Sequence, residues 1–256
     1  MVEDVCPVDP QALQEAEYGF PYHYVPQWRN GFTQCFYDDW GIHYVSTIEF
    51  LLDRLRDLSP ESMVDVGCGD GRMTRELALQ FPGRRVIGID YSTRAVALAK
   101  ALNSDLEGIE FSRLDITRSH DLPSSDAAIL MEVFEHIPPE SCREFLEGVR
   151  KLLQPGGTLL LTVPHVNQPL EPKHYRHFTA DTIRDALSDF FVVQEVVPFE
   201  RKGLCRRILR FLLGNRVFIL NSRRLRNFLY RVYKRHLFHV RDEADCRRLL
   251  VSAVAR

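Results

Sequence analysis

The chain has 256 residues, of which 45% are hydrophobic and 27% charged, and its formal net charge is −2. This length suits one large domain, or one domain with an appendage, and no apolar run approaches the roughly 20 residues of a membrane-spanning helix. The first residues are acidic and lack the basic and apolar regions of a signal peptide. Six scattered cysteines without a C-x-x-C pair indicate reduced thiols rather than disulfides or a zinc site. We therefore expect a cytoplasmic protein.

Residues 1–40 are expected to form an N-terminal arm. Nine aromatic residues lie between positions 17 and 40, but Pro21, Pro26 and Gly31 interrupt any regular periodicity. Two interpretations are open: the arm packs against the domain edge, or it closes as a lid over cofactor and substrate. Apolar residues then recur at helical spacing over residues 41–58, which predicts an amphipathic helix.

The stretch Ser62-Met-Val-Asp-Val-Gly-Cys-Gly-Asp-Gly71 is the centre around which the predicted fold is organised. A short run of mostly apolar residues leads into three glycines within five positions, and a helical pattern continues to residue 81. The stretch therefore predicts a strand, a tight turn and a helix N-terminus. A turn without Cβ atoms lets a ligand approach the backbone, and its N–H groups suit an anionic group.

Acidic residues follow the next two predicted strands. Arg85-Val-Ile-Gly-Ile-Asp90 ends in an acid that can accept both hydroxyls of a ribose, and Ser92 is placed to cap the helix after it. A short strand over 109–113 precedes Asp115. Further strands are predicted at 126–131, 158–163, 191–197 and 247–254, with helices at 139–153 and 179–187 and a turn at 155–157. This alternation predicts a doubly wound parallel α/β sheet.

Four ordered motifs resemble those of class I S-adenosylmethionine-dependent methyltransferases: Asp65-Val-Gly-Cys-Gly-Asp-Gly71, Gly88-Ile-Asp90, Leu114-Asp115-Ile116 and Leu153-Gln-Pro-Gly-Gly-Thr158. The glycine pattern G-x-G-x-G differs from the dinucleotide fingerprint G-x-G-x-x-G. The resemblance covers residues 40–198 and implies a seven-stranded Rossmann-like sheet in the order 3-2-1-4-5-7-6, with the seventh strand antiparallel. It also implies S-adenosyl-L-methionine as cofactor.

The resemblance also implies cofactor-binding residues. The turn glycines would let the methionine half of the cofactor lie on the backbone. Asp90 would accept hydrogen bonds from the ribose hydroxyls, and Asp115 would recognise the edge of the adenine. Tyr91 or Ile116 would lie against the adenine face. The residues expected at the cofactor are Asp65, Gly67, Cys68, Gly69, Asp70, Gly71, Asp90, Tyr91, Asp115, Ile116 and Met131.

The stretch Met131-Glu-Val-Phe-Glu-His136 is the candidate for chemistry. If it is helical, Glu132, Glu135 and His136 share one face and could hold a divalent metal. This E-x-x-E-H pattern is similar to those of the ubiquinone-pathway O-methyltransferases and the small-RNA 2′-O-methyltransferases. In the RNA family a further histidine ligand follows the fifth strand, where this chain offers His165, His174 and His177, and we assign His177 to that place. Without a metal, His136 or His174 would be the catalytic base.

Residues 199–244 form an insertion between the last two strands of a core made of residues 41–198 and 245–256. Residues 201–241 carry 13 Lys and Arg and no Asp or Glu. Two amphipathic helices are predicted, with apolar faces at Leu204, Ile208, Phe211 and Leu212, and at Leu225, Leu229 and Val232. Three interpretations are open: the insertion is a cap docked on the acidic core, it binds an anionic membrane surface, or it binds an anionic acceptor or nucleic acid. The apolar content favours lipid.

The sequence thus predicts a methyltransferase that acts on an oxygen of a hydroxylated small molecule or glycan, free or lipid-linked. The alternatives are an RNA 2′-O-methyltransferase and a non-catalytic cofactor-binding regulatory module. The expected location is the cytoplasm, with peripheral attachment to the cytoplasmic membrane face through residues 201–241.

Overall fold

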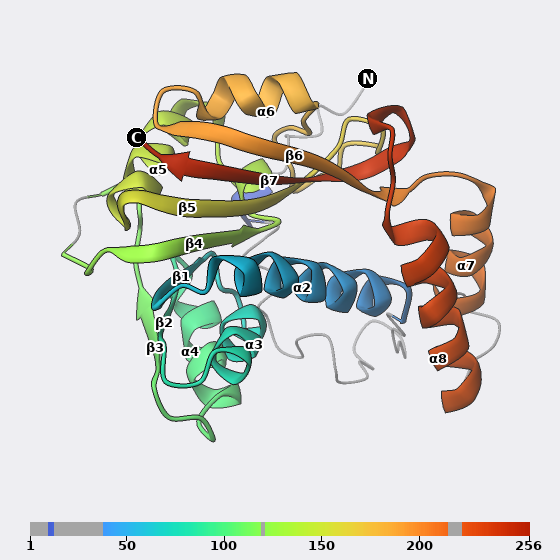
Figure 1. Cartoon of the computed structure of the whole chain (residues 1–256), viewed down its shortest axis with the longest axis horizontal. Coiled ribbons are helices and arrows are strands. Elements are labelled where there is room, and N and C mark those ends of the chain that lie inside the picture. The colour runs from blue at the N-terminus through green and yellow to red at the C-terminus, as the bar shows by residue number, and fades with distance from the viewer. Residues whose placement is uncertain (1–9, 13–37, 119–120, 215–221) are drawn as a thin grey trace, which may run out of the picture.

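The computed structural model describes residues 10–12, 38–118, 121–214 and 222–256 (Figure 1). The expected arm over residues 1–40 therefore lies almost wholly outside the described residues. Within them, a seven-stranded sheet has the order β3-β2-β1-β4-β5-β7-β6, which confirms the predicted fold. Strand β7 runs antiparallel to β5 and β6. The strands are β1 Ser62–Val66, β2 Arg85–Asp90, β3 Ile109–Arg113, β4 Ser125–Met131, β5 Leu153–Pro164, β6 Phe191–Arg201 and β7 Cys246–Ala255.

Helices cover both faces of this sheet because its central strands bury side chains on each side. In β1, Val64 and Val66 belong to the core with α5 and α6, whereas Met63 packs with α2 and α3 on the opposite face. Helix α4 packs on β2 and β3, and Ser92 caps it by accepting a hydrogen bond from Ala95 N at 3.3 Å, as predicted. The helices are α2 Asp38–Leu58, α3 Arg72–Gln80, α4 Thr93–Leu102, α5 Cys142–Lys151 and α6 Ala180–Leu187.

The predicted turn at residues 155–157 is wrong. Ser125 of β4 pairs with Leu153 and Ala127 pairs with Thr158, so residues 154–157 form a bulge within a longer β5. The preceding helix is also shorter than predicted: a 3₁₀ turn at Pro139–Ser141 leads into α5, which ends at Lys151.

The insertion after β6 is helical. It contains α7 Leu204–Gly214, α8 Arg223–Val232, a π-helical continuation Tyr233–Phe238 and a 3₁₀ turn Glu243–Asp245. Figure 1 shows α7 and α8 at one end of the molecule, beside α2. Leu209 and Leu213 of α7, together with Tyr233 and Phe238, are buried in one cluster with α2. No helix among the described residues is long and apolar enough to cross a membrane.

Candidate active site

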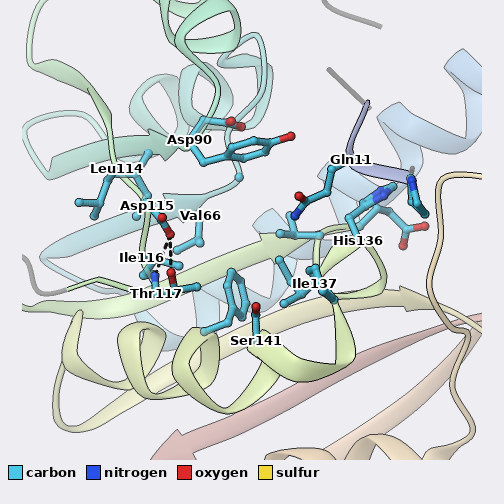
Figure 2. A pocket seen from close by; sticks show the side chains of 18 residues that line it. Gln11, Val66, Asp90, Leu114, Asp115, Ile116, Thr117, His136, Ile137 and Ser141 are labelled. Atoms are coloured by element: carbon cyan, nitrogen blue, oxygen red, sulfur yellow. Dashed lines mark hydrogen bonds between the residues drawn. The ribbon is translucent and has the colours of Figure 1, made fainter. Parts of the chain in front are cut away.

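A cavity of about 320 Å³ lies where β1, β2 and β4 end, at the carboxyl edge of the parallel strands. Ligands of doubly wound sheets bind at this edge. Figure 2 shows Asp90 and Asp115 toward one side of the cavity and His136 toward the other. Its lining comprises Pro10, Gln11, Val66, Gly67, Ile89, Asp90, Tyr91, Leu114, Asp115, Ile116, Thr117, Glu132, Val133, His136, Ile137, Pro138, Ser141 and Phe145.

Gly67, at the start of the glycine turn, lines this cavity. The N–H groups of Gly67 and Cys68 both donate to the Ile89 carbonyl, at 2.8 and 3.0 Å, which ties the turn to β2. Gly67 has φ 73°, and a Cβ there would lie 2.7 Å from a methyl group of Val133. The backbone therefore approaches the opposite wall at a position that only glycine can occupy without strain.

Asp90 links the turn to the cavity. One carboxylate oxygen accepts from Gly69 N at 3.0 Å and the other from Ser92 N at 2.8 Å. A carboxylate has about four lone-pair sites, so a bound ribose can share the same oxygens.

Another part of the cavity wall is built on Asp115 and Ile116. Asp115 accepts from the Thr117 hydroxyl at 2.6 Å and N–H at 3.2 Å, so its carboxylate is held in place. Helix α5 passes directly behind: a Cβ on Gly148 would lie 2.0 Å from the Ile116 carbonyl. The sequence reasoning missed Gly148, although a glycine inside a helical pattern signals close packing.

The predicted cofactor residues separate into two groups. Gly67, Asp90, Tyr91, Asp115 and Ile116 line the cavity; Asp65, Cys68, Gly69, Asp70, Gly71 and Met131 are not in its lining. Asp65 is buried and accepts from the Thr74 hydroxyl at 2.6 Å. Its burial raises the pKa of this carboxyl to about 7.

The condition that residues 132–136 are helical, on which the shared face depended, is not met. Strand β4 ends at Met131, Glu132 has φ 57°, and only Phe134–His136 forms a 3₁₀ turn. Glu132 therefore does not share a helical face with Glu135 and His136. Its carboxylate instead accepts from Arg248 Nε at 2.9 Å.

Histidines from two segments meet beside the cavity. His136 Nδ1 lies 3.0 Å from the Lys173 carbonyl, which can only accept, so Nδ1 carries the proton and Nε2 the lone pair. His177 Nδ1 likewise lies 3.3 Å from the Gln168 carbonyl, and its Nε2 is 2.9 Å from His174 Nδ1. His177 Nδ1 therefore donates to the Gln168 carbonyl, and His177 Nε2 accepts from His174 Nδ1–H. The lone pair of His174 consequently lies on Nε2 as well.

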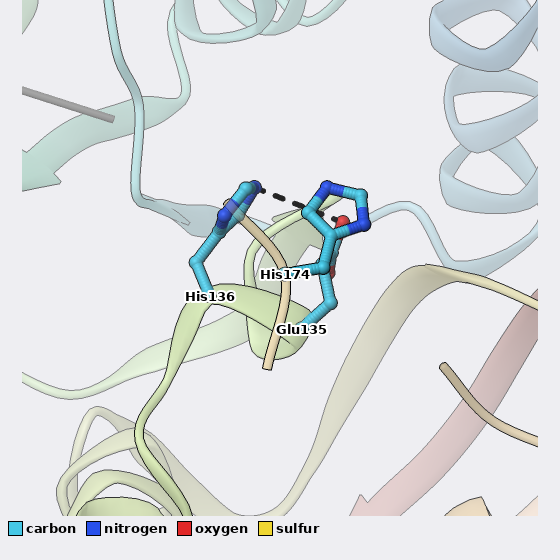
Figure 3. A group of neighbouring side chains, drawn as sticks. All are labelled: Glu135, His136 and His174. Atoms are coloured by element: carbon cyan, nitrogen blue, oxygen red, sulfur yellow. Dashed lines mark ion pairs between the residues drawn. The ribbon is translucent and has the colours of Figure 1, made fainter. Parts of the chain in front are cut away.

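Glu135 completes this group. Its side chain is fully buried, and among the described residues neither carboxylate oxygen has a hydrogen-bond partner. Burial, and then the neighbouring charge of Glu132, raise the pKa of Glu135 well above its ordinary value. Figure 3 shows Glu135, His136 and His174 facing one another, with His136 Nε2 4.0 Å from a Glu135 oxygen.

Residues 63–157 match a family model described as a methyltransferase domain. A trans-aconitate 2-methyltransferase of Deinococcus radiodurans is 37% identical over 43% of this chain and 42% of its own length. A ubiquinone biosynthesis O-methyltransferase of Cupriavidus pinatubonensis is 31% identical over 45% and 46%. The N-methyltransferase NodS of Bradyrhizobium japonicum, solved with S-adenosyl-L-homocysteine, has a TM-score of 0.53 at 19% identity, covering 80% of this chain and 84% of that one.

The match over residues 63–157 and the strand order of the described sheet both agree with a methyltransferase domain. The chain spans about half the length of the curated relatives it matches. The cavity lined by Gly67, Asp90 and Asp115 lies at the carboxyl edge of the parallel strands, where doubly wound sheets bind ligands.

The residues beside the cavity fit a divalent cation in part. Glu135, His136 and His174 each offer one ligand atom, and these atoms lie within 4.8 Å of one another. Two ligands of one ion at roughly 2.0–2.3 Å can be at most about 4.6 Å apart, so a small closure would suffice. The Nδ1–H groups of His136 and His174 each donate to a partner outside this group, as those of histidine ligands do in metal sites. The expected ligands Glu132 and His177 are not in this group: Glu132 pairs with Arg248, and His177 lies behind His174.

A buried cluster of charges lies behind Glu132, and the sequence reasoning missed it. Glu200, with 0% exposure, contacts Arg206 Nε at 3.0 Å, Arg248 Nη1, and His43 Nδ1 at 3.6 Å. Arg248 also reaches Glu132, so the cluster joins α7 to the cavity wall. Burial lowers the pKa of His43 to about 4, so this imidazole is neutral at pH 7.

We expect the change Asp90→Ala to weaken binding of S-adenosyl-L-homocysteine by about 10- to 150-fold, the equivalent of about 1.5–3 kcal/mol for hydrogen bonds to a charged acceptor. Calorimetric titration measures it, with thermal unfolding to check the turn that Asp90 holds. Asp105→Ala is the matched control, because Asp105 is exposed and pairs only with Arg75 among the ion pairs described. An affinity within twofold of wild type would remove Asp90 from the cofactor site.

Proposed function

We propose that the protein transfers the methyl group of S-adenosyl-L-methionine to a hydroxyl oxygen of a small molecule or glycan. One observation carries this proposal: His136, with its lone pair on Nε2, lines the same cavity as Gly67, Asp90 and Asp115. A proton acceptor therefore lies in the cavity that we expect to hold the methyl donor.

The reaction is an in-line displacement at the methyl carbon. The acceptor oxygen attacks from about 3–3.5 Å, the carbon–sulfur bond breaks, and the sulfonium becomes a neutral thioether. The hydroxyl proton passes to His136 Nε2. The protein's main contributions are to align the two reactants and to exclude water.

The imidazole favours a hydroxyl acceptor over a carboxylate. A carboxylate is already ionised at pH 7 and needs no base, whereas a phenol, with a pKa of about 10, must lose its proton. The named relatives include both kinds, since one acts on trans-aconitate and the other is an O-methyltransferase of ubiquinone biosynthesis. His136 supports the second kind of acceptor for this chain.

A divalent cation would be held by Glu135, His136 and His174. When bound, it would act as a Lewis acid that lowers the pKa of the acceptor hydroxyl. His177 would then orient His174 through its hydrogen bond at 2.9 Å.

The experiment supplies cofactor labelled in the methyl group together with catechols, hexoses, polycarboxylates or a short RNA. We expect label in a catechol or hexose, in a product that resists alkaline hydrolysis, because methyl ethers survive alkali and methyl esters do not. Label only in the polycarboxylate would overturn the hydroxyl assignment, and label in RNA would favour the 2′-O-methyltransferase alternative. Cofactor binding without any transfer would favour a regulatory module.

Chelation separates the two roles of His136. If His136 is the base, transfer continues after exhaustive treatment with EDTA, whereas a cation site predicts loss of activity and recovery on adding Mg²⁺, Mn²⁺ or Zn²⁺. Calorimetric titration of each metal into the wild-type protein and into Glu135→Gln gives a readout that does not depend on activity. Equal metal binding by both proteins would exclude Glu135 as a ligand.

A further inference from the structure

Helix α7 exposes a row of large apolar side chains, the outer stripe, which consists of Leu204, Ile208 and Phe211. Their exposed fractions are 69%, 51% and 60%. The residues are spaced four and three apart, so they align along one side of the helix. Single exposed apolar residues are ordinary on protein surfaces, but an aligned row of three marks an interaction surface.

The outer stripe points away from the protein core. The buried residues of α7 are Arg206, Leu209 and Leu213, which pack toward α2 and Glu200. At roughly 3.6 residues per turn, the outer stripe lies on the opposite side of the helix. The helix is therefore apolar on two sides: the inner side is buried, and the outer stripe is exposed.

Helix α8 adds to this surface. Leu225 and Phe228, three residues apart, are 41% and 54% exposed, and α8 has no buried residue. A cap that covered its own apolar faces would bury these side chains. The insertion thus caps the core through α7's inner side, Tyr233 and Phe238. Of the apolar faces predicted from the sequence, that of α7 is largely exposed, whereas that of α8 is divided: Leu225 is exposed and Leu229 packs against the core cluster.

The charged residues of the insertion around these side chains are all basic. Residues 201–241 contain no Asp or Glu. Of their basic residues, Arg206 pairs with Glu200 and Lys234 with Glu49. The exposed basic residues of the two helices are Arg207, Arg210, Arg223, Arg224 and Arg231.

We propose that α7 and α8 attach the protein to an anionic lipid bilayer, with the outer stripe inserted at the level of the headgroups. Basic residues beside an exposed apolar face are what an anionic interface binds. Nucleic acid would use the arginines but gain little from exposed Leu and Ile. A second copy of the chain is disfavoured, because a two-fold contact would bring this basic surface against itself.

The test is co-sedimentation of the whole chain with vesicles of phosphatidylcholine alone or mixed with phosphatidylglycerol. We expect pelleting only with the anionic vesicles, and weaker pelleting as salt increases. Ile208→Ser/Phe211→Ser and Arg223→Ser/Arg224→Ser should each lower the affinity about tenfold or more. The matched control is Leu79→Ser/Leu102→Ser, which removes two leucines, each 53% exposed, from α3 and α4 and should change the affinity by less than about twofold.

Three results would overturn the proposal. Equal pelleting with neutral and anionic vesicles, or none with either, rules out an anionic bilayer. Binding of a mixed-sequence RNA that the arginine changes weaken and the apolar changes do not would assign the surface to nucleic acid. Self-association in sedimentation velocity that is lost in Ile208→Ser/Phe211→Ser would assign it to a second copy. Cofactor binding and methyl transfer do not enter this test, so its failure leaves the proposed function unaffected.

Discussion

Replacing Glu200 with glutamine should lower the free energy of unfolding by about 3–5 kcal/mol, because it leaves buried guanidinium groups without their counter-charge. Glu200 is fully buried, and Arg206 and Arg248 both depend on it. Burial alone would raise the pKa of Glu200, but Arg248 and the other cations around it hold this pKa well below its ordinary value. The charged form is therefore the one that stabilises the fold.

Denaturant unfolding of wild type and variant measures the effect. Glu195→Gln is the matched control: Glu195 lies on the same strand, but it is exposed and pairs with Arg54 at 2.9 Å, so its loss should cost less than about 1 kcal/mol. A carboxylate whose pKa is lowered in the folded state stabilises the fold at pH values above its unfolded pKa, near 4.5. This stabilisation is lost progressively as the pH falls below that value. Glu200→Gln should therefore flatten the acid side of the stability curve. Equal stability of the two variants would show that the cluster contributes little.

The fold could be predicted because its signals are local. Glycines 67, 69 and 71 specify the turn, the acids at 90 and 115 follow strands, and helical spacing defines the segments between them. The bulge at residues 154–157 was missed since a Pro-Gly-Gly sequence also suits a turn, and only the pairing of β4 with β5 decides between them.

The charge cluster could not be predicted for a different reason. Arg206 is charged and does not belong to the predicted apolar face of its helix, so nothing in the local pattern marks it as buried. It lies inside because Glu200 is buried beside it, and Arg248, 116 positions from Glu132, completes the network. These are tertiary contacts between residues that no local pattern connects.

The arrangement of the histidines after the fifth strand differs from the prediction. Of His165, His174 and His177 the sequence analysis assigned His177 as the ligand, whereas the structure brings His174 close to Glu135 and His136. His165 is held by Glu243 at 2.9 Å, away from the other two, and the carbonyl of Gln168 decides which nitrogen of His177 faces His174. A backbone carbonyl has no sequence signature, so the tautomers became visible only in the structure.

Replacing His136 with glutamine should reduce kcat for methyl transfer by about 10²–10⁴-fold, the usual contribution of a positioned proton acceptor. Binding of S-adenosyl-L-homocysteine should stay within about threefold, because His136 lies at the far side of the cavity from Asp90 and Asp115 (Figure 2). The measurement uses the acceptor that the labelled-methyl assay identifies, with kcat and KM determined separately. His239→Gln is the control, since His239 is exposed and contacts Phe50 and Phe238 outside the cavity.

His174→Gln distinguishes how His136 acts. If His136 is a base by itself, His174→Gln should reduce kcat far less than His136→Gln, since burial lowers the pKa of His174 to about 3 and keeps it neutral at working pH. If the two imidazoles and Glu135 hold one cation, each single change should cost nearly as much as the double change, because the three act as a unit. Metal titration of the same variants then reports the loss of the site directly. Wild-type kcat in His136→Gln would remove this histidine from the mechanism and leave the acceptor to be deprotonated by another group.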